Sequence, residues 1–334
     1  MEQIVQLIHA NKNFVVAGHI SPDGDAIGSC FALAFALEKL GKNVSVMLES
    51  YPQRYNILPG NKFLLKEQTI PENIDVLIAL DSADAYRLGP GQILLQNSLL
   101  VKHSICIDHH KTNPGFADVN HIEPQASSTS EIVFRLIELL LKPEEICQDI
   151  ATNIYAGILC DTGGFKYNST APSTLQIAAR LINTGIPFTH LYNELLHTHT
   201  FAAGKAKGIV MQNATTSQGG KIVSSIITRE ELASAQANSA DLDGIVEYLL
   251  NTNSAQMAAL VYQKTNGSEN EVKISLRSHG PDVGNVAAKL GGGGHQMAAG
   301  ATTTGVPAKV LAHVLELMAQ EMEENSYEYQ NTNS

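Results

Sequence analysis

The sequence predicts an α/β protein whose N-terminal part is built on a parallel sheet. Short apolar runs alternate with segments of helical periodicity up to about residue 185. Several of these runs end just before an acidic residue or a histidine. The carboxyl ends of parallel strands converge on one crevice, where such folds bind their ligands. Because 334 residues exceed what one hydrophobic core usually fills, we expect a second domain.

The elements of the first domain follow from apolar periodicity and capping signals. A helix is expected after Asp25, because apolar residues recur there at spacings of three and four until Gly41. The run Ser128 to Glu131 matches a capping box and predicts a helix to about Leu141. Strands are expected at 14–17, 44–48, 74–80 and 105–107, and further helices from Pro143 to the turn at Asp161, at 173–183 and at 188–196.

The pattern changes at about residue 216, where a smaller C-terminal α/β domain is expected. Its predicted strands are 221–228, 258–264 and 271–277, with a turn at 265–268 and a closing helix at 307–324. The predicted organisation is a first domain at 1–185, a helical connector at 186–215, a second domain at 216–325 and a disordered tail at 326–334.

Composition limits the classes of partner. A formal charge of −11 argues against a protein that coats long nucleic acid, because that affinity comes from Lys and Arg. Short nucleotides remain possible ligands, since divalent ions can reverse the sign of the charge in an acidic crevice. The four cysteines show no C-x-x-C spacing, so no disulfide framework is expected. Without a signal segment or a membrane-length apolar run, a cytoplasmic protein with no membrane partner is expected.

Six residues at the predicted strand and helix ends have the chemistry of metal ligands. Each of them alone is more typical of a turn, a helix cap or an ordinary polar side chain. Together they indicate a binuclear site, because carboxylates and imidazoles bind divalent cations and a carboxylate can bridge two of them. The six are His19, Asp23, Asp25, Asp81, His109 and Asp161.

At these residues the chain resembles the DHH phosphoesterase superfamily, whose name comes from the triplet Asp108-His109-His110. The other motifs that carry the resemblance are Gly18 to Ser29, Asp81 to Asp84 and Gly157 to Gly163. The resemblance implies that His19, Asp23 and Asp81 hold one metal. Asp25, Asp81, His109 and Asp161 would hold the other, so that Asp81 bridges the two.

The resemblance also implies a reaction and its cofactors. Manganese is the expected metal, with magnesium or cobalt as alternatives, and a hydroxide held between two ions would attack phosphorus in line. Of the catalytic residues, His110 would face the phosphate and Asp108 would orient a metal-bound imidazole. We expect Asp84 and Arg87 to form a local structural pair that takes no part in the reaction.

A run of four glycines, Gly291 to Gly294, followed by His295 is the main feature of the second domain. Such a run lets the backbone come close to an anion, and a guanidinium such as that of Arg277 suits a terminal phosphate. This segment resembles the DHH-associated C-terminal domain, which implies an active-site cleft between the domains. The substrate-binding residues would be Arg277, Ser278, Gly292, Gly293, Gly294 and His295.

Within the superfamily the chain resembles two-domain bacterial enzymes that act on very short RNA. The implied function is hydrolysis of short oligoribonucleotides to mononucleotides and removal of the 3′-phosphate from 3′-phosphoadenosine 5′-phosphate. One alternative is a stand-alone phosphodiesterase for cyclic di-AMP or its linear product, and another is a nucleotide sensor without activity. A homodimer is implied by the resemblance alone.

Overall fold

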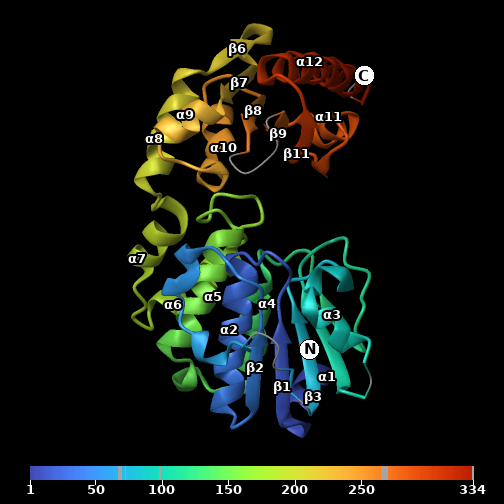
Figure 1. Cartoon of the computed structure of the whole chain (residues 1–334). Coiled ribbons are helices and arrows are strands. Elements are labelled where there is room, and N and C mark those ends of the chain that lie inside the picture. The colour runs from blue at the N-terminus through green and yellow to red at the C-terminus, as the bar shows by residue number, and fades with distance from the viewer. Residues whose placement is uncertain (67–69, 72, 98, 265–269, 333–334) are drawn as a thin grey trace. The chain divides into compact units, whose positions relative to one another are not determined.

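The computed structural model describes residues 1–66, 70–71, 73–97, 99–264 and 270–332. The chain divides into two compact units, Met1–Thr198 and His199–Ser334 (Figure 1). This division falls inside the range predicted as a helical connector, 186–215. In the described part of the chain, no helix combines the length and the apolar character needed to cross a membrane.

The first unit contains a five-stranded sheet in the order β2-β1-β3-β4-β5. Every pairing in it is parallel, so the predicted parallel sheet is confirmed. The short, half-exposed strand β5 was not predicted. The strands are β1 (Asn13–Ala17), β2 (Asn43–Met47), β3 (Ile74–Leu80), β4 (Val101–Asp108) and β5 (Val119–Ile122).

Strand β3 lies at the centre of this sheet and is buried along its whole length. Because β3 is buried on both faces, its sequence is a nearly continuous run of apolar residues. Val76 and Ile78 belong to the large core that α2, α4 and α5 share with one face of the sheet. Leu77 and Ala79 face the smaller core on the other side, which includes Leu94 of α3. The sheet is therefore covered on both faces.

Two helices of the first unit, α2 and α4, begin at polar side-chain caps, whereas the helix predicted from Pro143 starts with a 3₁₀ turn and becomes α-helical at Gln148. Asp23 caps α2 by accepting from the backbone N–H groups of Asp25 and Ala26. Ser128 caps α4, but the carboxylate of Glu131 accepts from other hydroxyl groups, so only half of the predicted capping box forms. The helices are α1 (Glu2–Ala10), α2 (Gly24–Lys39), α3 (Pro90–Leu95), α4 (Thr129–Leu140), α5 (Gln148–Asp161), α6 (Pro172–Ile182) and α7 (Phe188–Tyr192), which continues as a π-helical turn, Asn193–His197.

The second unit is built on a six-stranded mixed sheet in the order β10-β11-β9-β8-β7-β6. Only β7 and β8 pair in parallel. The predicted strands correspond to β7, β8 and β9, whereas the turn predicted at 265–268 lies outside the described residues. The strands are β6 (Thr215–Ser217), β7 (Ile222–Ile227), β8 (Met257–Gln263), β9 (Glu271–Ser278), β10 (Gly293–His295) and β11 (Ala298–Thr304).

Helices cover both faces of this second sheet. They are α8 (Phe201–Gln212), α9 (Arg229–Ser234), α10 (Ile245–Leu250), α11 (Val283–Lys289) and α12 (Pro307–Thr332). The first three contribute to one core and the last two to the other. Helix α12 runs to Thr332, so over 326–332 the structure has helix in place of the predicted disordered tail. No proline or glycine after Pro307 stops that helix.

Candidate metal centre

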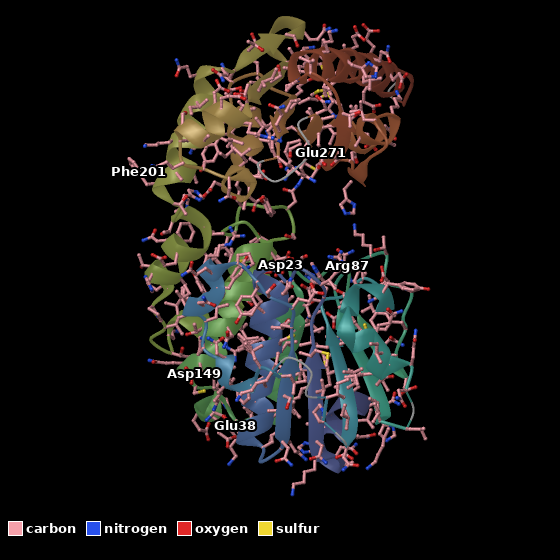
Figure 2. All side chains as sticks on the ribbon, in the orientation of Figure 1. Asp23, Glu38, Arg87, Asp149, Phe201 and Glu271 are labelled. Carbon is pink, nitrogen blue, oxygen red and sulfur yellow. The ribbon has the colours of Figure 1, made fainter. Side chains whose placement is uncertain are left out.

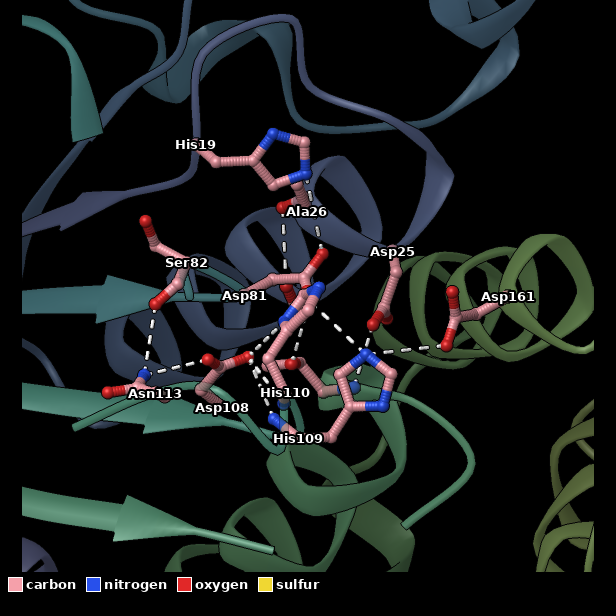
Figure 3. Close-up of polar contacts among 12 residues, drawn as sticks. His19, Asp25, Ala26, Asp81, Ser82, Asp108, His109, His110, Asn113 and Asp161 are labelled. Atoms are coloured by element: carbon pink, nitrogen blue, oxygen red, sulfur yellow. Dashed lines mark hydrogen bonds and ion pairs between the residues drawn. The ribbon is translucent and has the colours of Figure 1, made fainter. Parts of the chain in front are cut away.

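Three strand ends bring predicted ligands to the carboxyl edge of the parallel sheet (Figure 3). His19 follows β1, and Asp81 directly follows β3. Asp108 is the last residue of β4, and His109 comes next. Asp81 has a φ of 56°, in the left-handed region that Asp tolerates better than most residues, and this turns the chain at the end of β3.

Two helix ends complete the set. Asp23 caps α2 and Asp25 lies in its first turn. Asp161 is the last residue of α5, which packs against α2 and so brings that carboxylate to the same place. The structure therefore gathers all six predicted ligands into one cluster, although their roles as ligands stay a prediction.

The carboxylate of Asp81 lies at the centre of the cluster. Its Oδ2 is 3.7 Å from Nε2 of His19, and its Oδ1 is 3.6 Å from Nε2 of His109. The same nitrogen of His19 is 3.8 Å from Oδ1 of Asp23, and that of His109 is 3.5 Å from Oδ2 of Asp161. Asp81 thus presents one oxygen to each histidine.

Groups of donor atoms in the cluster are close enough to share a cation. One group is His19, Asp23 and Asp81, another is Asp25, His109 and Asp161, and within each group the donor atoms lie within 4.8 Å of one another. A further group joins Asp81, Asp108, His109 and His110. Asp81 therefore belongs to the His19 group and also contacts His109 of the second group.

Helix α4 holds two of the carboxylates in place, a feature that the sequence analysis did not predict. The backbone N–H groups of Thr129 and Ser130 donate to Oδ2 and Oδ1 of Asp25, at 2.7 and 2.9 Å. The hydroxyl of Thr129 donates to Oδ1 of Asp81 at 3.0 Å. The positive end of the helix dipole also faces these carboxylates and stabilises their charge.

Hydrogen bonds fix the orientation of the histidine rings. Nδ1 of His19 lies 2.7 Å from the carbonyl oxygen of Ile20, which can only accept, so Nδ1 carries the proton. The lone pair on Nε2 then faces Asp23 and Asp81, as a metal ligand requires. Nδ1 of His110 lies 2.7 Å from Oδ1 of Asp108, so this ring is oriented by that carboxylate.

Asp108 is fully buried and accepts from protein donors through both oxygens. Oδ1 accepts from the backbone N–H groups of His109 and His110, and Oδ2 accepts from Nδ2 of Asn113 at 2.7 Å. Burial alone would raise the pKa of Asp108, but the hydrogen bond with the His110 ring, followed by that from Asn113, holds it below its usual value. Such a carboxylate suits an orienting role, and Asn113 is a supporting residue that the sequence analysis missed.

Three of the other carboxylates, those of Asp25, Asp81 and Asp161, repel one another. Burial, together with the charges of Asp25 and the other neighbouring carboxylates, raises the pKa of Asp81 well above its usual value. Burial and the charge of Asp25 likewise raise the pKa of Asp161 to about 7. Burial also raises the pKa of Asp25. The cluster therefore lacks positive charge, and binding a cation would stabilise the ionised carboxylates.

The donor set fits divalent cations. It offers carboxylate oxygens and imidazole nitrogens, which suit manganese, magnesium or zinc, and it has no thiolate among its predicted ligands. His19, Asp23 and Asp81 would hold one cation, and Asp25, Asp81, His109 and Asp161 the other. This assignment fits the structure because the carboxylate of Asp81 lies between the two groups and its neighbours provide too little positive charge to balance the clustered carboxylates.

In the second unit, strand pairing brings Arg277 and His295 onto one face of the sheet. Ala298 of β11 pairs with His295 on one side and with Arg277 on the other, and directly paired residues share a face. The guanidinium of Arg277 is not free, because its Nε lies 3.1 Å from Oε1 of Glu247. Ser278 is buried, and its hydroxyl accepts from the backbone N–H of Gly280.

The glycine run has a structural explanation at two of its positions. Residues 293–295 form the short strand β10. A Cβ at Gly292 would lie 2.2 Å from the carbonyl oxygen of Gly300, and one at Gly294 would lie 2.5 Å from Cα of Ala299. At Gly293 nothing lies within 4 Å. Only Gly293 is therefore free of a packing requirement among these three.

The parallel sheet, the His and Asp cluster and the second mixed-sheet unit define one class of protein: the chain belongs to the DHH family. Residues 13–158 match the DHH family, N-terminal domain, and residues 219–324 match the DHHA1 domain. Among its relatives is the bifunctional oligoribonuclease and PAP phosphatase NrnA of Thermus thermophilus, 33% identical over 93% of this chain and 91% of the relative. The protein of the same name from Bacillus subtilis is 26% identical over 90% of this chain and 92% of the relative.

Solved structures agree on the fold. The crystal structure of an exopolyphosphatase-related protein from Bacteroides fragilis is 28% identical and has a TM-score of 0.85, covering 97% of this chain and 95% of that one. A structure of exonuclease RecJ bound to manganese has a TM-score of 0.53 at 14% identity, covering 96% of this chain and 94% of that one. That second likeness shows the fold alone.

Proposed function

We propose that this protein is a metal-dependent phosphoesterase that hydrolyses short oligoribonucleotides to mononucleotides. It also removes the 3′-phosphate from 3′-phosphoadenosine 5′-phosphate. The names of the relatives from Thermus thermophilus and Bacillus subtilis support both activities. Manganese as the metal and the cytoplasm as the location belong to the same proposal.

The observation that carries the proposal is the position of Asp81 between two histidines. A carboxylate with one oxygen toward His19 and the other toward His109 suits a bridging ligand of a two-cation site. When bound, two divalent cations would activate water and offset the negative charge that develops on the phosphate. No Ser or Cys nucleophile is then required.

The protein's own residues orient the reacting groups. The N-terminus of α4 fixes Asp25 and Asp81 before substrate arrives, so little reorganisation is needed during the reaction. Asp108 accepts from Nδ1 of His110, and His110 is a half-buried group whose doubly protonated ring could donate from Nε2 to a phosphate oxygen. We propose this role for His110 in place of direct metal binding.

Recognition of one terminal nucleotide is proposed for the second unit. Arg277 and His295 share a face of its sheet, and Gly293 leaves open space beside His295. The protein has a net charge of −11 and so lacks the basic composition of proteins that bind long strands. The cleft between the domains and the homodimer stay predictions.

The test compares turnover of several substrates by the full chain loaded with Mn²⁺. These are a ladder of di- to decaribonucleotides, 3′-phosphoadenosine 5′-phosphate and cyclic di-AMP. We expect rates to fall as the RNA lengthens and to vanish after metal is stripped. Asp81→Ala should abolish turnover, whereas Asp149→Ala, at the exposed start of α5, should leave it unchanged.

Other outcomes would contradict parts of the proposal. A dominant rate on cyclic di-AMP, or undiminished cleavage of the decamer, would overturn the choice of substrate. Tight nucleotide binding without release of any product would favour a sensor. Full activity of metal-stripped protein would overturn the metal chemistry.

A further inference from the structure

Arg87 places a cation beside the ligand cluster. It lies on the 3₁₀ turn Ala85–Leu88, in the loop that follows Asp81. Its Nη2 is 3.5 Å from Nδ1 of His19. Figure 2 labels Arg87 and Asp23 at the same end of the first unit. The side chain is exposed and so accessible to a ligand at this end of the sheet.

The backbone of Arg87 is held on both sides. Its N–H donates to Oδ1 of Asp84 at 3.0 Å, and its carbonyl oxygen accepts from the N–H of Ile20 at 2.6 Å. Asp84 and Arg87 do contact each other, as predicted, but through the backbone of Arg87. The guanidinium therefore takes no part in that pair and extends from a fixed base.

Among the residues that the structure describes, no hydrogen-bond acceptor explains the position of the guanidinium. Nδ1 of His19 already donates to the carbonyl oxygen of Ile20, so Nδ1 and Nη2 of Arg87 are two donors and cannot bond to each other. No ion pair between Arg87 and a carboxylate forms within the described residues. Its planar set of N–H groups is thus available to a ligand.

The charge of the cluster indicates that this ligand is an anion. The five clustered carboxylates of Asp23, Asp25, Asp81, Asp108 and Asp161 carry five formal negative charges, and two divalent cations would supply four positive ones. With the hydroxide that the two cations would hold, two net negative charges would face an anionic substrate. A neighbouring guanidinium offsets one of them and matches two phosphate oxygens at once.

We infer that Arg87 binds the phosphate of the substrate at the His19 side of the cluster. This inference rests on the proposed phosphoesterase function and adds a substrate-binding residue to it. Arg87 does not ligate metal, because a guanidinium has no lone pair to offer. Its loss should therefore weaken phosphate binding and leave cation binding intact.

The experiment compares Arg87→Gln and Arg87→Lys with Lys39→Gln. Lys39 is exposed in the last turn of α2, about 24 Å along that helix from the cluster, so this control removes the same charge at a distance. Three quantities are measured for each protein. They are KM and kcat for 3′-phosphoadenosine 5′-phosphate, Mn²⁺ affinity by calorimetry, and the affinity of the Mn²⁺-loaded protein for inorganic phosphate.

We expect Arg87→Gln to raise KM and weaken inorganic phosphate binding by roughly 10- to 100-fold, the loss typical of a charged hydrogen bond. Mn²⁺ affinity should stay within about twofold of wild type, Arg87→Lys should restore part of the loss, and Lys39→Gln should match wild type. Unchanged phosphate affinity in Arg87→Gln, or a parallel loss of Mn²⁺ affinity, would overturn the inference. If the wild-type protein turns over no substrate, the proposed function fails, and the phosphate titration alone decides the role of Arg87.

Discussion

The hydroxyl of Thr129 donates to Oδ1 of Asp81 at 3.0 Å, across 48 residues of sequence. Both side chains are buried, so water does not compete for this bond. Thr129 also donates its backbone N–H to Asp25. One residue at the start of α4 thereby orients two carboxylates from two different elements of the parallel-sheet unit.

Replacing Thr129 with Val should weaken cation binding without unfolding the protein. Valine keeps the shape of threonine and the backbone N–H to Asp25, but it leaves Oδ1 of Asp81 without its hydroxyl donor. We expect Mn²⁺ affinity to fall about 10-fold or more, as is usual when a group that supports a metal ligand is lost. Calorimetric titration measures this affinity, and Thr129→Ser should restore it. Equal Mn²⁺ affinities of the Thr129→Val variant and the wild-type protein would show that the hydroxyl does not support the site.

Replacing Asp161 with Asn should remove one of the two cations. Asp161 contacts His109 and belongs to the group of Asp25 and His109, so the His19 group stays complete. We expect one Mn²⁺ per chain and a loss of turnover of at least about 100-fold. Elemental analysis and product assays measure these two quantities. Asp149→Asn, at the other end of α5, should keep two cations, and two cations retained in the Asp161 variant would contradict the assignment.

Asp75, at the start of β3, should contribute stability that depends on pH. An ion pair from Lys102 and hydrogen bonds from Asn13 and Lys12 lower the pKa of Asp75 to about 2. A carboxyl whose folded pKa lies below its unfolded value stabilises the protein above the unfolded pKa. That contribution is lost as pH falls toward 2.

Asp75→Asn should therefore lower the free energy of unfolding by about 1 kcal/mol at pH 6, because solvent around the exposed Lys102 weakens the ion pair. The difference from wild type should shrink as pH falls from about 4 to about 2. Denaturant titrations of both proteins across this range give the difference, and other carboxyl groups cancel because both proteins carry them. A difference that does not change with pH would show that the charge of Asp75 is not responsible.

Alanine substitutions in the glycine run should show which of these positions packing restricts to glycine. Gly292→Ala places a Cβ against the carbonyl oxygen of Gly300, so we expect a loss of about 1–3 kcal/mol in the free energy of unfolding. Gly293→Ala meets open space and should leave stability unchanged. Thermal and denaturant unfolding measure both variants. Equal destabilisation by the two would contradict the packing explanation.

The sequence was sufficient to predict the strands that carry the site. Residues 74–80 are apolar because β3 is buried on both faces, and the predicted and observed bounds of this strand agree. Strand β11 was missed because its sequence, Ala-Ala-Gly-Ala-Thr-Thr-Thr, has no large apolar residue and no regular alternation. The end of α12 was missed because polar composition was interpreted as disorder where no helix-breaking residue occurs.

The ligand cluster was predicted from residue type and position, but its supports were not. Asp25 and Ser130 are 105 residues apart, and only the packing of α4 against α2 brings them together. The side chain of Glu131 illustrates the same limit, since its position suits a capping box although it accepts from the hydroxyls of Ser127, Ser173 and Thr174. The position of Arg87 likewise depends on a contact between separate loops, in which its carbonyl oxygen accepts from the N–H of Ile20.

The most direct test of the central claim is an electron paramagnetic resonance titration of the metal-stripped full chain with Mn²⁺. If Asp81 bridges two cations, the protein should bind two Mn²⁺ per chain and show a spin-coupled spectrum when saturated. Asp81→Asn should lose that coupling. Saturation at one Mn²⁺, or two uncoupled ions in the wild-type protein, would contradict a shared carboxylate and with it the proposed two-cation phosphoesterase site.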